Sequence, residues 1–322
     1  MNVRFGILGL GQISTRFATV LNTVEGVKLA AVAARDAEKA ARFARDFGAS
    51  KACRDYLELI RDPDVDIVYI GLTTNLHYKF TRLCLENHKA VLCEKPLVTT
   101  RAQAEELAAL AEKNQTLLME AMWTRCLPAF QQARQWVKAG RIGAVRLITA
   151  NFCFNLGFYD PAARFYDPNL AGGSLFDVGV YLLDFASGVL DEYPQQVQGL
   201  ARLTPSRVDA AASLSLSFPG GALASLNCAV DVQAEEEAEI YGSTGRIVLE
   251  NCYGPKTCSL FDGEGKLLER FEDPEPDGFA HQVRHAADLF RRGEIQSNLI
   301  PWQDSIQCAG YFDLLRKQWG LI

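Results

Sequence analysis

The chain has 322 residues and a formal net charge of −6, with 48% hydrophobic and 22% charged residues. This length is too great for one ordinary core and suits two domains that meet at a cleft. The negative charge argues against nucleic acid or an anionic membrane as a partner, and no apolar run approaches the length that a bilayer requires. The amino-terminal residues show no basic and apolar leader, so a cytoplasmic protein is expected.

The nine cysteines are scattered, mostly in apolar segments, and are predicted to be reduced and structural. Cys252 and Cys258 are separated by five residues and have no histidine nearby, which is a poor pattern for zinc. His281 and His285 lie four residues apart, but Gln282 stands where a zinc protease has its glutamate. We therefore expect no metal site.

The first predicted element is a strand at Val3–Leu8 that runs into a glycine turn and then a helix. Ser14 takes the place of the third glycine that usually packs such a helix against its strand. A turn of this kind brings backbone N–H groups to a pyrophosphate at the helix N-terminus. We expect it to bind a dinucleotide through four neighbouring residues: Gly9, Gly11, Gln12 and Ile13.

Further strands alternate with helices as far as residue 119. Asp36 is placed to cap the helix that Gly48 ends, and Thr100 and Gln103 have the spacing of a capping box. The alternation predicts a doubly wound parallel sheet, which binds ligands at the carboxyl ends of its strands. The six strands are expected at Val3–Leu8, Val27–Ala34, Ala49–Cys53, Val65–Ile70, Ala90–Cys93 and Leu117–Met119.

The end of the second strand indicates which dinucleotide is bound. Domains that bind NAD usually have an acidic residue there for the ribose, but this chain has Arg35, with Lys39 one helical turn later. Two cations suit a 2′-phosphate, and the guanidinium can also stack on the adenine, so NADP is predicted. The alternative is that Asp36 binds the ribose and the two basic side chains are merely solvated.

Two later strands also end in polar residues. The strand Val65–Ile70 leads into a loop at Thr73–His77, and the strand Ala90–Cys93 delivers Glu94 and Lys95. Because the carboxyl ends of parallel strands lie at the same edge of a sheet, Lys95 is expected at the dinucleotide site.

A helix is predicted at Ala129–Ala139, after which the pattern changes to long alternating strands that predict a large, mostly antiparallel sheet in an α+β domain. Residues 1–122 are therefore assigned to a dinucleotide-binding domain and residues 123–322 to a domain for substrate binding and dimerisation. Leu214 and Leu216 share one face of their strand, whereas Ser213 and Ser215 share the other. This flat, lightly polar face can pack against a copy of itself, so a homodimer is expected. The strands are predicted at Val145–Phe154, Gln196–Leu203, Ala210–Phe218, Ala222–Val232, Ala238–Tyr241, Ile247–Glu250 and Cys258–Phe261.

A helix after Gly172 and Gly173 carries the remaining candidates. Asp177 and Tyr181 lie four residues apart, outside the apolar stripe, and are expected to face the cleft. Asp184 is interpreted as a capped or solvated carboxylate.

Hydride transfer from an alcohol needs a group that takes the hydroxyl proton and a cation that stabilises the developing oxyanion. Lys95 and Tyr181 can divide these roles, because an ammonium near a phenol favours the phenolate. Asp177 would orient the substrate, and Glu94 would hold Lys95 or contact the cofactor. The alternative is a solvated Lys95 and a half-buried, structural Tyr181.

Five segments occur in a characteristic order: Gly6–Gly11, Val32–Asp36, Ala90–Pro96, Met119–Arg125 and Gly172–Tyr181. Together they resemble the glucose-fructose oxidoreductase / inositol dehydrogenase (Gfo/Idh/MocA) family, and within it most closely the dimeric dihydrodiol dehydrogenases, which are NADP-linked and also oxidise D-xylose. Inositol-type members have histidine where this chain has Tyr181.

The resemblance implies a Rossmann domain for residues 1–122 and roles for individual residues. Lys95 and Tyr181 would form the catalytic pair, and Arg35 and Lys39 would bind the 2′-phosphate. Further cofactor contacts are implied for Thr73, Asn75, His77, Glu94, Trp123 and Arg125. No motif fixes the substrate pocket, for which Asn155, Phe158 and Tyr159 are candidates.

The expected function is an NADP-dependent oxidoreductase that acts on a secondary alcohol or hemiacetal carbon of a sugar or cyclic trans-diol. The first alternative is an NADPH-dependent reductase of a keto-sugar such as an anhydrofructose. The second is a regulator that senses dinucleotide and sugar without turnover, although such a protein would have no need of Lys95 and Tyr181.

Overall fold

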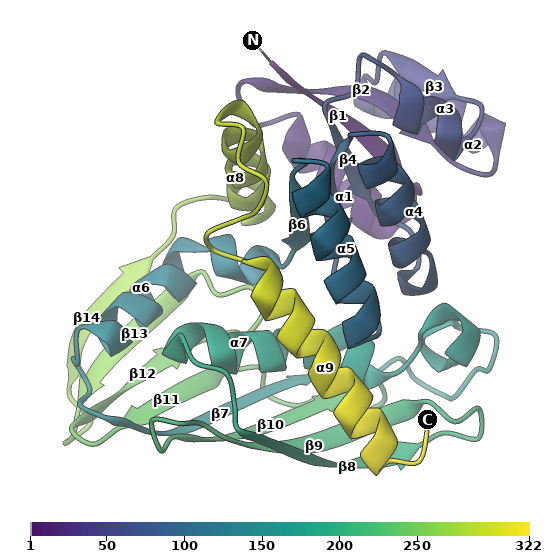
Figure 1. The fold of residues 1–322 in the computed structure, drawn as a ribbon. Helices are drawn as coiled ribbons and strands as arrows, with labels where there is room; N and C mark the ends of the chain where they lie inside the picture. The colour runs from purple at the N-terminus through teal and green to yellow at the C-terminus, as the bar shows by residue number, and fades with distance from the viewer. Residues whose placement is uncertain (1) are drawn as a thin grey trace. The chain divides into compact units, whose positions relative to one another are not determined.

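The computed structural model describes residues 2–322, which divide into two compact units. The first unit contains the residues up to Met122 together with Asp277–Ile306, and the second contains Trp123–Pro276 together with Gln307–Ile322. Figure 1 shows the helices and strands that make up each unit.

The first unit is built on a six-stranded sheet with the order β3-β2-β1-β4-β5-β6, in which every neighbouring pair is parallel. Its central strands are fully buried, as their continuous apolar sequences require when helices cover both faces. The doubly wound parallel sheet predicted from the sequence is confirmed. Its elements are β1 (Val3–Leu8), α1 (Gln12–Leu21), β2 (Val27–Ala33), α2 (Ala37–Phe47), β3 (Lys51–Cys53), α3 (Tyr56–Arg61), β4 (Ile67–Ile70), α4 (Thr74–Glu86), β5 (Ala90–Glu94), α5 (Arg101–Lys113) and β6 (Leu118–Ala121).

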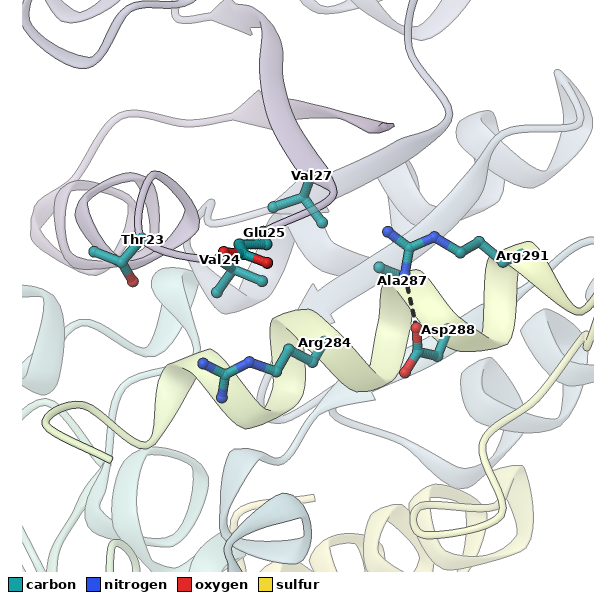
Figure 2. A pocket seen from close by; sticks show the side chains of 8 residues that line it. All are labelled: Thr23, Val24, Glu25, Val27, Arg284, Ala287, Asp288 and Arg291. Atoms are coloured by element: carbon teal, nitrogen blue, oxygen red, sulfur yellow. Dashed lines mark hydrogen bonds and ion pairs between the residues drawn. The ribbon is translucent and has the colours of Figure 1, made fainter. Parts of the chain in front are cut away.

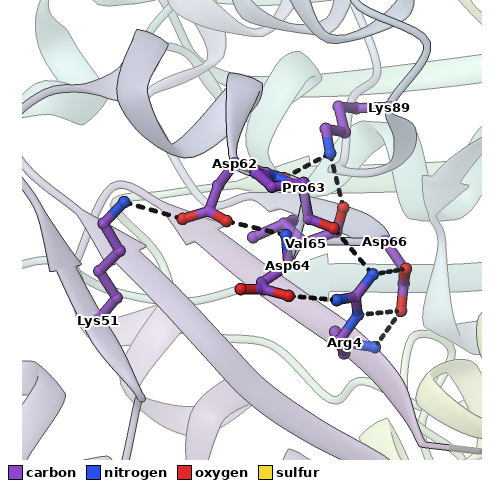
Figure 3. Close-up of polar contacts among 8 residues, drawn as sticks. All are labelled: Arg4, Lys51, Asp62, Pro63, Asp64, Val65, Asp66 and Lys89. Atoms are coloured by element: carbon purple, nitrogen blue, oxygen red, sulfur yellow. Dashed lines mark hydrogen bonds and ion pairs between the residues drawn. The ribbon is translucent and has the colours of Figure 1, made fainter.

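Charged residues pin the chain at the amino-terminal ends of these strands (Figure 3). The guanidinium of Arg4 donates to Asp66 through Nε at 3.0 Å and Nη2 at 2.8 Å, and to Asp64 at 2.7 Å. Lys89 Nζ donates to the carbonyl oxygens of Asp62 and Val65, and burial lowers the pKa of Lys89. These contacts of Arg4 and Lys89 fix the loop between α3 and β4.

Residues 277–306 were assigned to the second domain from the sequence, but in the structure they belong to the first unit. Helix α8 (Phe279–Arg291) lies against α1 (Figure 1). Arg16 of α1 donates twice to Asp277, at 2.9 and 2.8 Å, and its guanidinium lies 4.1 Å from the ring centre of Phe279. The apolar face of α8 is thus buried on the parallel-sheet unit, to which it returns after the whole second sheet.

The second unit contains an eight-stranded sheet with the order β14-β13-β12-β11-β7-β10-β9-β8, antiparallel except where β10 pairs with β7. The predicted large, mostly antiparallel sheet is confirmed. One strand was not predicted: β14 (Leu267–Glu272) is an edge strand that is exposed along almost its whole length, so it shows no alternation. The other strands are β7 (Val145–Cys153), β8 (Gln196–Leu203), β9 (Asp209–Ser217), β10 (Leu223–Ala229), β11 (Ala238–Gly242), β12 (Gly245–Leu249) and β13 (Thr257–Asp262).

Helices α6 (Pro128–Lys138) and α7 (Val180–Leu190) pack on one face of this sheet (Figure 1). Leu214 and Leu216 point to the covered face and are buried, whereas Ser213 and Ser215 are exposed, as the alternation predicted. The apolar stretch Pro168–Leu190 is long enough to cross a membrane by length and composition, but 89% of its most apolar window is buried inside the protein. This burial is typical of a core helix.

Candidate active site

The glycine turn after β1 presents an open helix N-terminus. Gly9 has φ +82° and lies so close to Leu72 that an added Cβ would be 2.6 Å from Leu72 Cδ2, whereas a Cβ on Gly11 would meet nothing within 4 Å. Gly11 is the N-cap of α1 without any side-chain cap, and the first turn of α1 has no acidic residue. Exposed N–H groups and an uncapped helix dipole fit the pyrophosphate of a dinucleotide.

Arg35 and Lys39 are exposed at the carboxyl end of β2 and in the first turn of α2. Within residues 2–322 neither side chain forms an ion pair. The side chain of Asp36 already has hydrogen-bond partners within α2, because its Oδ1 accepts from the backbone N–H groups of Glu38 at 2.9 Å and Lys39 at 3.1 Å. In the alternative interpretation Asp36 would bind the ribose, but in the structure its carboxylate caps α2.

Thr73, Asn75 and His77 were expected in a loop, but Thr74 already begins α4, so Thr73 is its N-cap and the other two lie in its first turns. Only residues 71–73 separate the end of β4 from the start of α4. Thr73 Oγ1 donates to Asn75 Oδ1 at 2.7 Å. The three residues stay candidates for cofactor contacts from a helix N-terminus rather than from a flexible loop.

The imidazole of His77 is buried between two carbonyl oxygens, with Nδ1 2.8 Å from Pro96 O and Nε2 3.0 Å from Leu72 O. Burial lowers the pKa of His77, against the opposing effect of these two contacts. A neutral imidazole has only one N–H to donate. His77 therefore joins the segment after β4 to the segment after β5, directly beside Lys95.

Glu94 and Lys95 follow β5, and the Lys95–Pro96 peptide bond is cis. Glu94 is buried, which raises the pKa of its carboxyl group, while a 2.7 Å hydrogen bond from Tyr69 Oη and the nearby ammonium of Lys95 act in the opposite direction. Glu120 Oε1 accepts from the backbone N–H of Leu97 at 2.9 Å. Glu94 Oε2 accepts from the backbone N–H of Lys95 at 3.3 Å, so two buried carboxylates hold the backbone around the half-buried Lys95.

In the second unit, Tyr181 lies in an aromatic cluster. Its hydroxyl accepts a hydrogen bond of 3.2 Å from Nε1 of Trp123, and its ring lies 5.5 Å from Phe152 and 5.9 Å from Tyr253. Phe152 and Tyr253 stack with ring centres 3.9 Å apart. Gly254 leaves space for Trp123, because a Cβ there would be 2.5 Å from Cη2 of the indole. Two of the predicted site residues, Trp123 and Tyr181, are therefore in direct contact.

Asp177 lies in a π-helical turn, Leu175–Gly179, that runs into α7. The wider turn changes the register of an ordinary helix, and such turns often occur at functional sites. Asp177 is partly exposed and Tyr181 is buried, and Arg164 Nη1 lies 3.3 Å from Asp177 Oδ1. Arg164 belongs to the segment between β7 and α7, and no motif in the sequence pointed to it.

Arg125 was expected near the cofactor, and Asp184 was interpreted as capped or solvated. The structure buries both and pairs them, with Arg125 Nε donating to Asp184 Oδ2 at 2.7 Å. A Cβ on Gly188 would lie 2.1 Å from Cζ of Arg125, so the guanidinium packs flat on the helix backbone. Asp184 is thus neither a cap nor solvated, and a cofactor contact of Arg125 stays a prediction.

A hollow of ≈ 480 Å³ lies in the first unit between the α1–β2 connection and α8 (Figure 2). It is lined by Glu25, Val27, Arg284 and Arg291, among others, and Arg291 Nη2 donates to Gly26 O. Val27 is the first residue of β2, so the hollow is at the amino end of the sheet. It is therefore separate from the glycine turn, which follows the carboxyl end of β1.

Comparisons with known proteins match both parts of the sequence. The model of the oxidoreductase family with an NAD-binding Rossmann fold (GFO_IDH_MocA) matches residues 3–122, and the GFO/IDH/MocA C-terminal domain matches residues 130–248. Trans-1,2-dihydrobenzene-1,2-diol dehydrogenase from Homo sapiens is 34% identical, and that from Mus musculus is 32% identical. Each alignment covers 100% of this chain and 98% of the relative.

Solved structures agree with this result. KijD10, a 3-ketoreductase from Actinomadura kijaniata solved with NADP and TDP-benzene, has a TM-score of 0.87 at 28% identity, and 98% of each chain is covered. Aldose-aldose oxidoreductase from Caulobacter crescentus, solved with glycerol, has a TM-score of 0.89 at 26% identity and covers 98% of this chain and 97% of its own. The chain belongs to the Gfo/Idh/MocA family of oxidoreductases.

Proposed function

We propose that this oxidoreductase uses NADP to transfer a hydride to or from a secondary alcohol or hemiacetal carbon of a sugar or cyclic trans-diol. The observation that carries the proposal is the hydrogen bond that Trp123 Nε1 donates to the phenol oxygen of the buried Tyr181. The names of the dihydrodiol dehydrogenase relatives and of the sugar oxidoreductase structures support the substrate class.

The preference for NADP rests on the residues after β2. Arg35 and Lys39 are exposed and free of ion pairs within residues 2–322, and Asp36 is occupied as a helix cap. KijD10 was solved with NADP, which supports the same choice. When bound, the nicotinamide supplies the hydride acceptor or donor; the chain's own residues bind the phosphates and handle the proton.

In the proposed reaction, Tyr181 exchanges a proton with the substrate hydroxyl. The ammonium of Lys95 lowers the cost of the phenolate and of negative charge on the substrate oxygen. Asp177 accepts a hydrogen bond from the substrate and orients it. This division of labour requires Lys95 and Tyr181 to approach each other when the substrate is bound, which stays a prediction.

Two variants test the roles of the catalytic pair. Lys95→Ala and Tyr181→Phe are expected to bind NADP as tightly as the parent protein while turnover falls by roughly three orders of magnitude. Lys113→Ala and Tyr78→Phe, which change an exposed lysine and a partly exposed tyrosine outside the site, are the matched controls. Parent-like turnover in either test variant would refute the assignment.

A second candidate is the reductive direction, the NADPH-dependent reduction of a keto-sugar. The observation that favours it is the structural similarity to KijD10, a 3-ketoreductase. A panel of pentoses, hexoses, keto-sugars, anhydro-sugars and dihydrodiols, followed by NADPH absorbance in both directions, separates the two. The candidate with the higher kcat/KM is retained.

We also propose a cytoplasmic homodimer. All nine cysteines are buried free thiols, as in a reducing compartment. The uncovered face of the eight-stranded sheet carries exposed leucines among its polar side chains, with Leu200 82% exposed and Leu223 54% exposed. Leu200→Arg is expected to reduce the mass measured by light scattering at micromolar concentration from that of two chains to that of one; a monomeric parent protein would refute the dimer.

A further inference from the structure

Asp209, the first residue of β9, lies at the beginning of the helical segment that carries Asp177 and Tyr181. Its side chain is buried, and the residue is 3% exposed. Oδ2 accepts a hydrogen bond of 2.7 Å from Ser174 Oγ and another of 2.6 Å from the backbone N–H of Leu175. A carboxylate from a neighbouring strand therefore caps the π-helical turn from outside the helix.

Gly173 leaves space for the carboxylate of Asp209. A Cβ on Gly173 would lie 2.3 Å from Oδ1 of Asp209, and the residue has φ +114°, which side chains other than glycine rarely allow. Its backbone N–H donates to Phe165 O at 2.8 Å, so the turn is held on the other side as well. Gly173, the second of the two glycines before the helix, thus admits a carboxylate to the helix start.

The groups around Asp209 make its charge sensitive to pH. Burial raises the pKa of Asp209 to about 6, against the hydrogen bonds from Ser174 and Leu175. Arg316 of α9 (Trp302–Gln318) is the nearby cation that favours the ionised form. From β10, the thiol of Cys228 contacts Ser174 Oγ at 3.4 Å, and burial holds the pKa of that thiol at about 12, so it is neutral.

We propose that Asp209 is a positioning residue: in its ionised form it fixes the start of the π-helical turn and thereby the placement of Asp177 and Tyr181. The carboxylate is the stronger acceptor for two donors on one oxygen, and a protonated acid weakens both bonds. Asp209 touches neither substrate nor cofactor in this proposal. The catalytic consequence rests on the function proposed above.

Asp209→Asn tests the proposal, because the amide keeps the shape and one acceptor oxygen but cannot ionise. Parent kcat is expected to fall as pH decreases through about 6, and the variant is expected to show a kcat about tenfold lower at pH 8 with KM nearly unchanged. The ratio of parent to variant kcat should then approach one at pH 5. A ratio that is the same at pH 5 and pH 8 would overturn the proposal.

Hydrogen exchange of the peptide that spans residues 172–183 gives a readout that does not depend on turnover. In the parent protein its protection, corrected for intrinsic rates, should fall between pH 7 and pH 5, whereas the variant should show the lower protection throughout. Equal protection in parent and variant at pH 8 would refute the positioning role even if the proposed function is confirmed. Refutation of the proposed function alone would leave this exchange result unaffected.

Ser174→Ala is the second variant, for the case that Asp209→Asn does not fold. It removes one of the two donors and leaves the charge. A smaller fall in kcat with the pH dependence retained is expected, and circular dichroism checks that both variants are folded. Parent-like kcat and exchange in Ser174→Ala would contradict the proposed capping contact.

Discussion

Three cations at the amino end of the parallel sheet in the first unit differ in their partners from two cations at its carboxyl end. At the amino end, Arg4, Lys51 and Lys89 all have partners: Arg4 binds Asp64 and Asp66, Lys51 binds Asp62 at 3.0 Å, and Lys89 binds backbone carbonyls (Figure 3). At the carboxyl end, Arg35 and Lys39 are exposed and have no ion pair within residues 2–322.

This difference distinguishes cations that stabilise the protein from cations that are available to a ligand. A charge already neutralised by a carboxylate contributes to the fold and is a poor phosphate ligand. An exposed cation without an ion pair contributes little to the fold and is available to an anion. Changes at the amino end should therefore alter stability, and changes at the carboxyl end should alter cofactor affinity.

The double change Arg35→Ala and Lys39→Ala should have the largest effect. Loss of two charge-assisted contacts with a 2′-phosphate is expected to cost about 3 kcal/mol, and thus to lower kcat/KM for NADP about a hundredfold. The value for NAD, which lacks this phosphate, should change little. Steady-state kinetics with both dinucleotides measures the ratio.

Arg42→Ala with Arg45→Ala is the matched control, since it removes two exposed cations further along α2. It should leave both kcat/KM values unchanged and so separate local contacts from net charge. An equal loss of kcat/KM for NADP in the control and test variants would mean that only the overall electrostatic field of the protein is involved.

The glycine turn gives a comparison of neighbouring positions. Gly11→Ala should fold normally, because its Cβ meets no atom, but should weaken dinucleotide binding about tenfold or more by blocking close approach of the pyrophosphate. Gly9→Ala should also lower the melting temperature, because φ +82° and the contact with Leu72 strain it. Calorimetric binding and thermal unfolding distinguish them, and tight dinucleotide binding by Gly11→Ala would exclude this turn as the phosphate site.

At the amino end, Arg4→Met should reduce stability by about 2 kcal/mol without any effect on kcat/KM. The partly buried Asp66 would lose its side-chain partner, and the loop between α3 and β4 would lose its anchor. Urea unfolding at pH 7 measures the change. A fall in NADP affinity equal to that of the Arg35 and Lys39 double variant would break the comparison of the two ends.

Features that follow from local chemistry were predicted from the sequence. The caps of α2, the glycine turn and the alternation of β9 depend on neighbouring residues, and all appear in the structure. The family resemblance and the two-sheet fold were also predicted correctly. The site residues Lys95 and Tyr181 stay a prediction that the proposed variants test.

Features that depend on distant pairing were not predicted. The sequence of α8 indicates a helix but does not indicate which sheet buries it. Arg125 and Asp184 form an ion pair although they lie far apart in the sequence. The π-helical turn before α7 changes a register that an ideal helix would keep. Asp209 has no motif, because its function depends on the approach of a strand to a helix start.

The smallest predicted effect is on the stability of the protein at acidic pH. Asp66 is partly buried, which by itself raises its pKa, but the hydrogen bonds and charge of Arg4 outweigh burial and leave the pKa lowered. A carboxyl group whose native pKa lies below its unfolded value of about 3.9 stabilises the protein above that value and loses this contribution as pH falls through the native pKa. The stability difference between the parent protein and Arg4→Met should therefore be constant from pH 7 to pH 5 and should shrink below about pH 4. A difference that persists unchanged at pH 3 would show that Arg4 acts through packing, because its effect would then not depend on the charge of Asp66.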